Sequence, residues 1–197
     1  MSQLFAKEKT KSAVKICGIT SGAQAEAIIA LGADALGINF WPKSKRYLPL
    51  AEARHWLQNL ERSVLRVAVT VNASDEELRK IHDSGVIDFI QLHGDESPER
   101  VRSLLGAGLP VFKALGVRDE MTLQEAEGYP EGPLLLDAYA PTAYGGSGET
   151  MDWALGAAAV RQWPERGILL AGGLTPGNVA EAIQQVRAAA IDVASGV

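Results

Sequence analysis

Residues 64–93 read VLRVAVTVNASDEELRKIHDSGVIDFIQLH and contain one complete strand–helix–strand unit. The two ends of this stretch, Val64–Val71 and Asp88–His93, are short apolar runs, as is typical of buried strands. Between them, Ser74 is followed three residues later by Glu77, which is the pattern of a capping box at the start of a helix. Two short strands separated by a helix predict a parallel pair of strands.

The same unit recurs along most of the chain. Six further apolar runs alternate with segments of helical period, and each run ends near a polar or glycine-bearing cluster. These six predicted strands are Ala13–Cys17, Ala35–Phe40, Pro110–Leu115, Pro133–Asp137, Gly167–Ala171 and Ala190–Ser195. In one of the intervening segments, Thr175 followed by Pro176 predicts a helix that begins at the proline.

Eight such units favour an α/β fold, a single-domain (β/α)8 TIM barrel, because closure of a parallel sheet removes both of its edges. An open doubly wound sheet is the alternative that the spacing leaves open. The predicted catalytic barrel covers residues 13–197, and the polar, lysine-rich residues 1–12 are predicted to be a flexible N-terminal extension. No helical segment follows the last predicted strand, so we expect a barrel without its last helix.

A barrel of that kind leaves the outer faces of its first and last strands uncovered. Uncovered apolar faces favour association, so we expect the chain to form a homo-oligomer. Leu4 and Phe5 of the N-terminal extension are an alternative cover for the same strands.

The composition limits the classes of partner. The chain has 197 residues, of which 47% are hydrophobic and 22% charged, and these figures fit one globular domain. Its net charge of -5 argues against nucleic acid as the main partner, because proteins that bind nucleic acid usually carry a basic face. No apolar run approaches the roughly 18 residues of a membrane helix, and no secretory signal is present. We therefore expect a soluble, cytoplasmic protein that does not contact a membrane.

Polar residues at the ends of the predicted strands are the candidate site residues, because the active sites of such barrels lie at the carboxyl ends of the strands. They are Cys17, Asn39, Asn72, Gln91, His93, Lys113, Asp137 and Ser195. Cys17 and Asp137 end the first and sixth strands and should face each other across the barrel mouth. The sequence contains no zinc-ligand spacing, dinucleotide fingerprint or P-loop, so we expect neither a metal nor a cofactor.

Six sequence motifs, in unbroken order and each near the end of a predicted strand, carry a family resemblance. They are Val14–Thr20 (VKICGIT), Pro42–Tyr47 (PKSKRY), Gln91–Glu96 (QLHGDE), Tyr144–Gly148 (YGGSG), Ala171–Leu174 (AGGL) and Asp192–Val197 (DVASGV). With these motifs the chain strongly resembles the phosphoribosylanthranilate isomerases of tryptophan biosynthesis. The resemblance implies a cofactor-free Amadori rearrangement, in which N-(5-phosphoribosyl)anthranilate becomes 1-(2-carboxyphenylamino)-1-deoxyribulose 5-phosphate.

The resemblance also implies the two catalytic roles. Asp137 would be the general acid that opens the ribose ring, and Cys17 the general base that removes the C2 proton. The acid requires a raised pKa, whereas a thiol that acts as a base requires its thiolate to be stabilised. Lys15 lies two residues before Cys17 and could supply the positive charge from the same face of the strand. We hypothesise that Asp192 on the last strand pairs with Lys15.

The substrate implied by the resemblance is a small anionic phosphosugar. Arg46 suits its anthranilate carboxylate, and His93 and Asp192 are expected near the substrate. Its phosphate is expected at the glycine-bearing loops after the last two strands, where backbone N–H groups are accessible. The residues expected there are Gly172, Gly173, Ser195 and Gly196. Tyr144–Gly148 resembles the family's mobile loop that closes over the substrate.

Two other functions remain open at this level. Another phosphosugar barrel, such as a related isomerase or epimerase, would keep the phosphate loops but has no use for Cys17, Arg46 and Asp137 together. A non-catalytic barrel that lacks its last helix and acts as a binding scaffold is the second alternative. Turnover of the substrate separates the scaffold from both enzymes.

Overall fold

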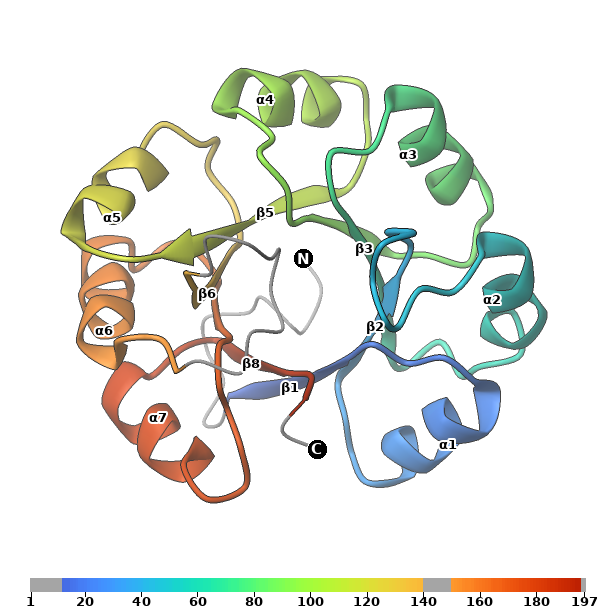
Figure 1. The fold of residues 1–197 in the computed structure, drawn as a ribbon, viewed down its shortest axis with the longest axis horizontal. Helices are drawn as coiled ribbons and strands as arrows, with labels where there is room; N and C mark the ends of the chain where they lie inside the picture. The colour runs from blue at the N-terminus through green and yellow to red at the C-terminus, as the bar shows by residue number, and fades with distance from the viewer. Residues whose placement is uncertain (1–11, 140–149, 196–197) are drawn as a thin grey trace.

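Eight parallel strands form a closed barrel in the computed structural model, which describes residues 12–139 and 150–195 (Figure 1). Each strand pairs with its neighbours in chain order, and β8 pairs with β1 to close the sheet. The predicted (β/α)8 barrel is therefore confirmed over the open doubly wound sheet. Three predicted features lie outside the described residues: residues 1–11 of the extension, the loop Tyr144–Gly148 and Gly196.

The predicted strands agree with the observed ones to within two residues at either end. The strands are β1 (Ala13–Cys17), β2 (Ala35–Asn39), β3 (Leu65–Thr70), β4 (Phe89–Leu92), β5 (Val111–Val117), β6 (Leu134–Ala138), β7 (Ile168–Leu170) and β8 (Ala190–Val193). The helices that cover them are α1 (Gly22–Ala30), α2 (Leu50–Leu57), α3 (Asp75–Asp83), α4 (Pro98–Gly106), α5 (Glu120–Ala126), α6 (Trp153–Gln162) and α7 (Val179–Val186).

Side-chain caps mark the start of most of the helices, but α2 and α7 begin without one. The capping box of Ser74 and Glu77 forms as predicted at the start of α3. The helix predicted to begin at Pro176, however, begins only at Val179. The side chain of Asn178 accepts a hydrogen bond from the Thr175 N–H and donates one to the Gly173 carbonyl. These bonds hold the segment before α7 as a turn.

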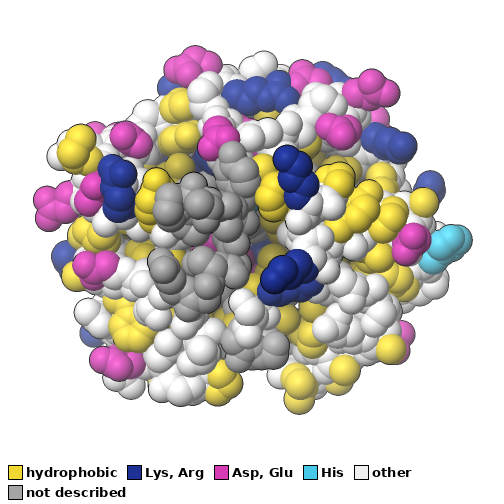
Figure 2. All heavy atoms as spheres, in the orientation of Figure 1, with side chains coloured by type: hydrophobic (Ala, Val, Ile, Leu, Met, Phe, Trp, Pro, Cys, Tyr) yellow, Lys and Arg dark blue, Asp and Glu magenta, His cyan; other side chains and the backbone are white. Residues whose placement is uncertain are grey.

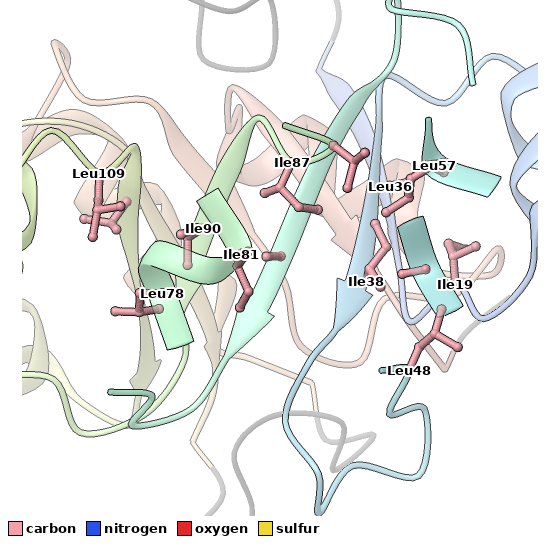
Figure 3. Packing of buried hydrophobic residues seen from close by; sticks show 14 of the residues in the cluster. Ile19, Leu36, Ile38, Leu48, Leu57, Leu78, Ile81, Ile87, Ile90 and Leu109 are labelled. Carbon is pink, nitrogen blue, oxygen red and sulfur yellow. The ribbon is translucent and has the colours of Figure 1, made fainter. Parts of the chain in front are cut away.

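The barrel interior is filled by the inward-facing side chains of the strands. Small residues dominate this inner cluster, which comprises Ala13, Ala35, Val67, Phe112, Ala114, Leu135, Leu169, Ala171 and Ala190. Larger aliphatic side chains fill the layer between the strands and the helices, as Figure 3 shows for Leu36, Ile38 and Ile90. Successive side chains of a strand point to opposite faces, so the residue two positions after an inner one also points inward. This alternation aims particular polar side chains at the barrel mouth.

The ring of helices is interrupted between α7 and α1 (Figure 1). No helix follows β8 within the residues that the structure describes, in agreement with the predicted lack of a last helix. A groove of 640 Å³ lies in this place, and the apolar residues that line it include Val14, Ile16, Ile28 and Leu31. Leu31 is 88% exposed. In the described part of the chain, no helix is long and apolar enough to cross a membrane.

Candidate active site

Four strands aim polar side chains into the carboxyl-terminal end of the barrel. On β1, Lys15 and Cys17 follow the inner residue Ala13 at alternate positions. In the same way, Gln91 on β4 and His93, directly after this strand, follow the partly buried Phe89. Asp137 on β6 and Asp192 on β8 each come two residues after an inner residue, Leu135 and Ala190 respectively. The alternation of the strands thus gathers these six side chains in one place.

The Asp137 carboxylate is held at both of its oxygens. The backbone N–H of Ala138 donates to Oδ1 at 2.8 Å, and Nε2 of His93 lies 3.3 Å from Oδ2. Both side chains are largely buried, and His93 is 14% exposed. Asp137 therefore has a fixed orientation, with His93 as its titratable contact within the described part of the chain.

Cys17 lies on the opposite side of the mouth, above a buried ion pair. Nζ of Lys15 is 2.8 Å from Oδ1 of Asp192, which confirms the hypothesised pairing of these residues. Gly37 on β2 lies beside Cys17 in the sheet. A Cβ at this glycine would lie 2.7 Å from Sγ of Cys17 and 3.1 Å from Nζ of Lys15, so only glycine leaves room for both side chains.

The electrostatics of Cys17 differ from the expectation of a stabilised thiolate. Burial raises the pKa of the Cys17 thiol, and the nearby Asp192 carboxylate acts in the same direction. The Lys15 ammonium and the Arg46 guanidinium lower this pKa, but together they do not offset burial. The expected direction is therefore wrong for the site without substrate, because the cost of transferring the thiolate charge out of water outweighs both neighbouring cations.

Arg46 lies at the rim of the mouth beside the thiol. Its Nη1 donates to the backbone carbonyl of Cys17 at 3.2 Å, and its side chain covers Gly18, where any Cβ would collide with it. Gly18 has a φ of +89°, a conformation that also favours glycine. The guanidinium is thereby placed next to the predicted base rather than out in solvent.

The expected phosphate loops are only partly within the described residues. Gly172 and Gly173 follow β7 with φ values of +83° and +62°, and Gly172 packs closely against the backbone of Ala138. These glycines therefore lie beside the end of β6, which carries Asp137. Ser195 follows β8 and lines the groove near Cys17 and Arg46.

Three of the candidate strand-end residues contact the loops through their side chains. Asn39 accepts a hydrogen bond from the Trp41 N–H, and Asn72 contacts Asp95 through its side chain. Lys113 follows the inward-facing Phe112 and therefore points outward.

Lys113 and Glu96 form a buried pair to which sequence reasoning gave no role. Nζ of Lys113 donates to Glu96 at 3.1 Å and to the carbonyls of Leu92 and Gly94, which flank His93. Glu96 also accepts the backbone N–H groups of Asn72 and Gly94. The pair thus fixes the loop that carries His93. The acidic residues next to His93 were the only signal for it in the sequence.

Comparisons with known proteins identify the family. The family model for N-(5'-phosphoribosyl)anthranilate isomerase matches residues 14–197. The chain belongs to the phosphoribosylanthranilate isomerase family. A curated N-(5'-phosphoribosyl)anthranilate isomerase from Rubrobacter xylanophilus is 44% identical over 183 residues, which are 92% of this chain and 87% of the relative. The resemblance inferred from the six motifs is therefore confirmed, and with it the class of enzyme, an isomerase of tryptophan biosynthesis.

Solved structures of phosphoribosylanthranilate isomerases share this fold. The enzyme from Thermotoga maritima superposes with a TM-score of 0.84 at 39% identity, covering 94% of this chain and 89% of that chain. Another structure of the family, with a TM-score of 0.81 at 38% identity over 94% and 88% of the two chains, contains reduced 1-(o-carboxyphenylamino)-1-deoxyribulose 5-phosphate. A further Thermotoga maritima structure describes its parent enzyme as dimeric.

Proposed function

We propose that this chain isomerises N-(5'-phosphoribosyl)anthranilate to 1-(2-carboxyphenylamino)-1-deoxyribulose 5-phosphate, with Asp137 as general acid and Cys17 as general base. The observation that carries these roles is that both side chains face the same end of the barrel from different strands. An acid and a base on two sides of one sugar are sufficient for an Amadori rearrangement.

The acid acts first in this mechanism. Asp137 donates its proton to the ring oxygen of the ribose while the bond between that oxygen and C1 breaks. The lone pair of the anthranilate nitrogen forms a double bond to C1, which leaves a cationic imine and a new hydroxyl at C4. The cation makes the C2 proton acidic.

The base then acts on the cationic intermediate. Cys17 takes the C2 proton, and the released electron pair forms the C1–C2 double bond of an enolamine while the nitrogen becomes neutral. The enolamine loses its O2 proton and gains a proton at C1, which gives the ketone. The positive charge of the imine favours the thiolate and opposes the effect of burial on the pKa of Cys17, so opening of the ring increases the fraction of Cys17 in the deprotonated form that can accept a proton.

Recognition of the substrate is assigned to the rim. Arg46 suits the anthranilate carboxylate because its planar guanidinium can bind both oxygens and already lies beside Cys17. The phosphate is assigned to the backbone of Gly172 and Gly173, together with Ser195. In Figure 2, Lys and Arg side chains lie both near the middle of the face and toward its edge, where several Asp and Glu side chains also lie.

Turnover of freshly prepared substrate, followed by the loss of anthranilate fluorescence, tests the proposal. Cys17→Ala and Asp137→Asn should each lower kcat by roughly 10² to 10⁴, the usual worth of a positioned acid or base. Asp83→Asn, which changes an exposed carboxyl at the end of α3, is the matched control and should keep the wild-type rate. A wild-type rate in either of the first two variants would remove that residue's role, and the absence of turnover in the wild type would favour a scaffold.

A further inference from the structure

Gln91 is a buried polar side chain below the active site, and the proposed roles of Asp137 and Cys17 give it no function. It lies in β4, is fully buried and points into the barrel. Its Nε2 lies 3.0 Å from Nδ1 of His93. Its Oε1 has no hydrogen-bond partner among the described residues, and an unpaired buried carbonyl oxygen costs free energy. Such an atom requires an explanation.

His93 connects this amide to the general acid. The imidazole contacts Gln91 through Nδ1 and Oδ2 of Asp137 through Nε2. Its backbone N–H donates to the Thr70 carbonyl at 2.8 Å, and Lys113 binds the carbonyls on both sides of it. The ring is thus fixed between an amide and a carboxyl, with little freedom to turn away.

The orientation of the Gln91 amide reports how many protons the other two groups hold. An amide nitrogen only donates, so the observed contact requires an Nδ1 that accepts, and a neutral ring then carries its proton on Nε2, which faces Asp137. This arrangement fits an Asp137 that has given up its proton. If the amide turns over, Oε1 accepts from a protonated Nδ1, and His93 with Asp137 then holds one more proton.

Either orientation leaves one end of the amide without a partner. In the observed orientation this end is Oε1, and after the turn it would be Nε2. The two orientations therefore have similar costs, so the proton content of His93 and Asp137 decides between them. A side chain with hydrogen-bond partners for both of its polar ends, or for neither, would not change its orientation when His93 and Asp137 gain or lose a proton.

We propose that Gln91 and His93 are positioning residues that load Asp137 with the proton it donates to the substrate. This inference rests on the proposed role of Asp137. In the loaded state, Asp137 and His93 share an extra proton and the Gln91 carbonyl accepts from Nδ1–H. When Asp137 protonates the ring oxygen, the pair loses that proton and the amide returns to the observed orientation. Solvent then returns one proton to the pair, while Cys17 releases to solvent the proton taken from C2.

Other charged groups also face this pair. Asp192 on β8 interacts electrostatically with both Asp137 and His93, and Lys15 on β1 neutralises much of its charge. Behind the loop that carries His93, the carboxylate of Glu96 is paired with Lys113. Because all four groups are unchanged in variants of Gln91, a difference between those variants reports on the amide itself.

The pH dependence of kcat/KM in two variants of Gln91 tests the proposal. Gln91→Glu supplies only acceptors, so it should stabilise protonated Nδ1 and move the pH at which activity declines upward by about one unit. Gln91→Met fills similar space without a hydrogen bond to the ring and should move it downward. KM should change little in either variant. His55→Gln, which changes an exposed histidine, should keep the wild-type profile. The proposal would be overturned if the pH profiles of Gln91→Glu and Gln91→Met shifted in the same direction or did not shift.

The protonation of His93 can be measured without activity by ¹⁵N NMR of histidine-labelled protein. In the wild type above the midpoint of the pH profile, Nδ1 should be unprotonated and Nε2 protonated, whereas Gln91→Glu should hold a proton on Nδ1 at the same pH. His55 and His82 provide internal references. A protonated Nδ1 in the wild type throughout the pH range would refute the role of Gln91. Full activity of Asp137→Asn would instead refute the proposed acid, whatever the NMR result.

Discussion

Cys17 illustrates how a single side chain is governed by opposing physical effects. Burial raises the pKa of its thiol, and the buried ammonium of Lys15 lowers it. The Lys15–Asp192 pair also raises the pKa of Lys15, because Asp192 and Cys17 favour its charged form more strongly than burial opposes it. The ammonium therefore stays charged below the thiol. The pKa of Cys17 therefore depends on a fully buried neighbour.

Replacing Lys15 by Met should make the thiolate form of Cys17 less stable. Without the ammonium that lowers it, the pKa of Cys17 rises further, so a given rate of alkylation is reached only at higher pH. Rates of iodoacetamide alkylation measured against pH check this, and Lys80→Met, at an exposed position of α3, is the control. Adding Asp192→Asn to Lys15→Met avoids an unpaired buried carboxylate that would unfold the barrel. An unchanged profile would exclude Lys15 as the source of thiolate stabilisation.

Gly37 should tolerate no side chain. Gly37→Ala places a methyl group 2.7 Å from Sγ of Cys17, so the thiol or the strand must move. We expect a loss of about 1–3 kcal/mol in the free energy of unfolding and a reduced kcat. Urea denaturation and steady-state kinetics measure the two effects. Gly106→Ala, where no atom lies within 4 Å of the added carbon, should cause neither.

At the scale of elements, the loop after β4 depends on a buried ion pair outside the barrel. Lys113 and Glu96 are both almost fully buried, and together they satisfy backbone groups at Leu92, Gly94 and Asn72. This pair makes the loop a rigid support, so that His93 meets Asp137 in a defined geometry. Burial lowers the pKa of Lys113, which Glu96 partly counteracts.

Lys113→Met should destabilise the protein by about 3–5 kcal/mol, because it leaves the Glu96 carboxylate buried without its cation. Urea denaturation measures this loss. The double variant Lys113→Met, Glu96→Gln should recover part of it, since the remaining amide carries no charge. If the double variant were less stable than Lys113→Met alone, the cost would come from the backbone contacts of Glu96 rather than from its unpaired charge.

At the scale of the whole molecule, closure of the barrel brings strands from both ends of the chain to one site. The proposed ligand contacts come from the ends of β1, β6, β7 and β8 and from the loop after β2, which are far apart in the sequence. A ligand that binds these ends binds only the folded barrel, so binding should stabilise the entire fold.

Reduced 1-(o-carboxyphenylamino)-1-deoxyribulose 5-phosphate, the ligand of a related structure, should therefore raise the free energy of unfolding of the chain. Saturation at about 100 times Kd adds about 2.7 kcal/mol to the free energy of unfolding. Thermal denaturation with increasing ligand measures the effect. Arg46→Ala should weaken binding by about 1.5–3 kcal/mol, the worth of a hydrogen bond to a charged group, and should raise KM more than it lowers kcat. Equal ligand stabilisation of Arg46→Ala and the wild type would show that Arg46 does not contact the ligand.

The sequence by itself determined the eight strands and the positions of Cys17, Lys15, Asp137 and Asp192, because strand periodicity and the alternation of side chains are local properties. Closure was favoured as the arrangement without free edges, but the spacing also allowed an open doubly wound sheet, and the structure decided between the two. Even the Lys15–Asp192 pair could be anticipated, since the first and last strands of a closed barrel are neighbours.

Only the tertiary structure decided which of the other polar residues meet. The outward direction of Lys113, the contact of His93 with Asp137 and the unpaired amide of Gln91 depend on distances between separate strands and loops. The raised pKa of Cys17 likewise depends on how completely neighbouring strands exclude water. Burial and the distances between side chains depend on many residues that are far apart in the sequence, so no local pattern specifies them.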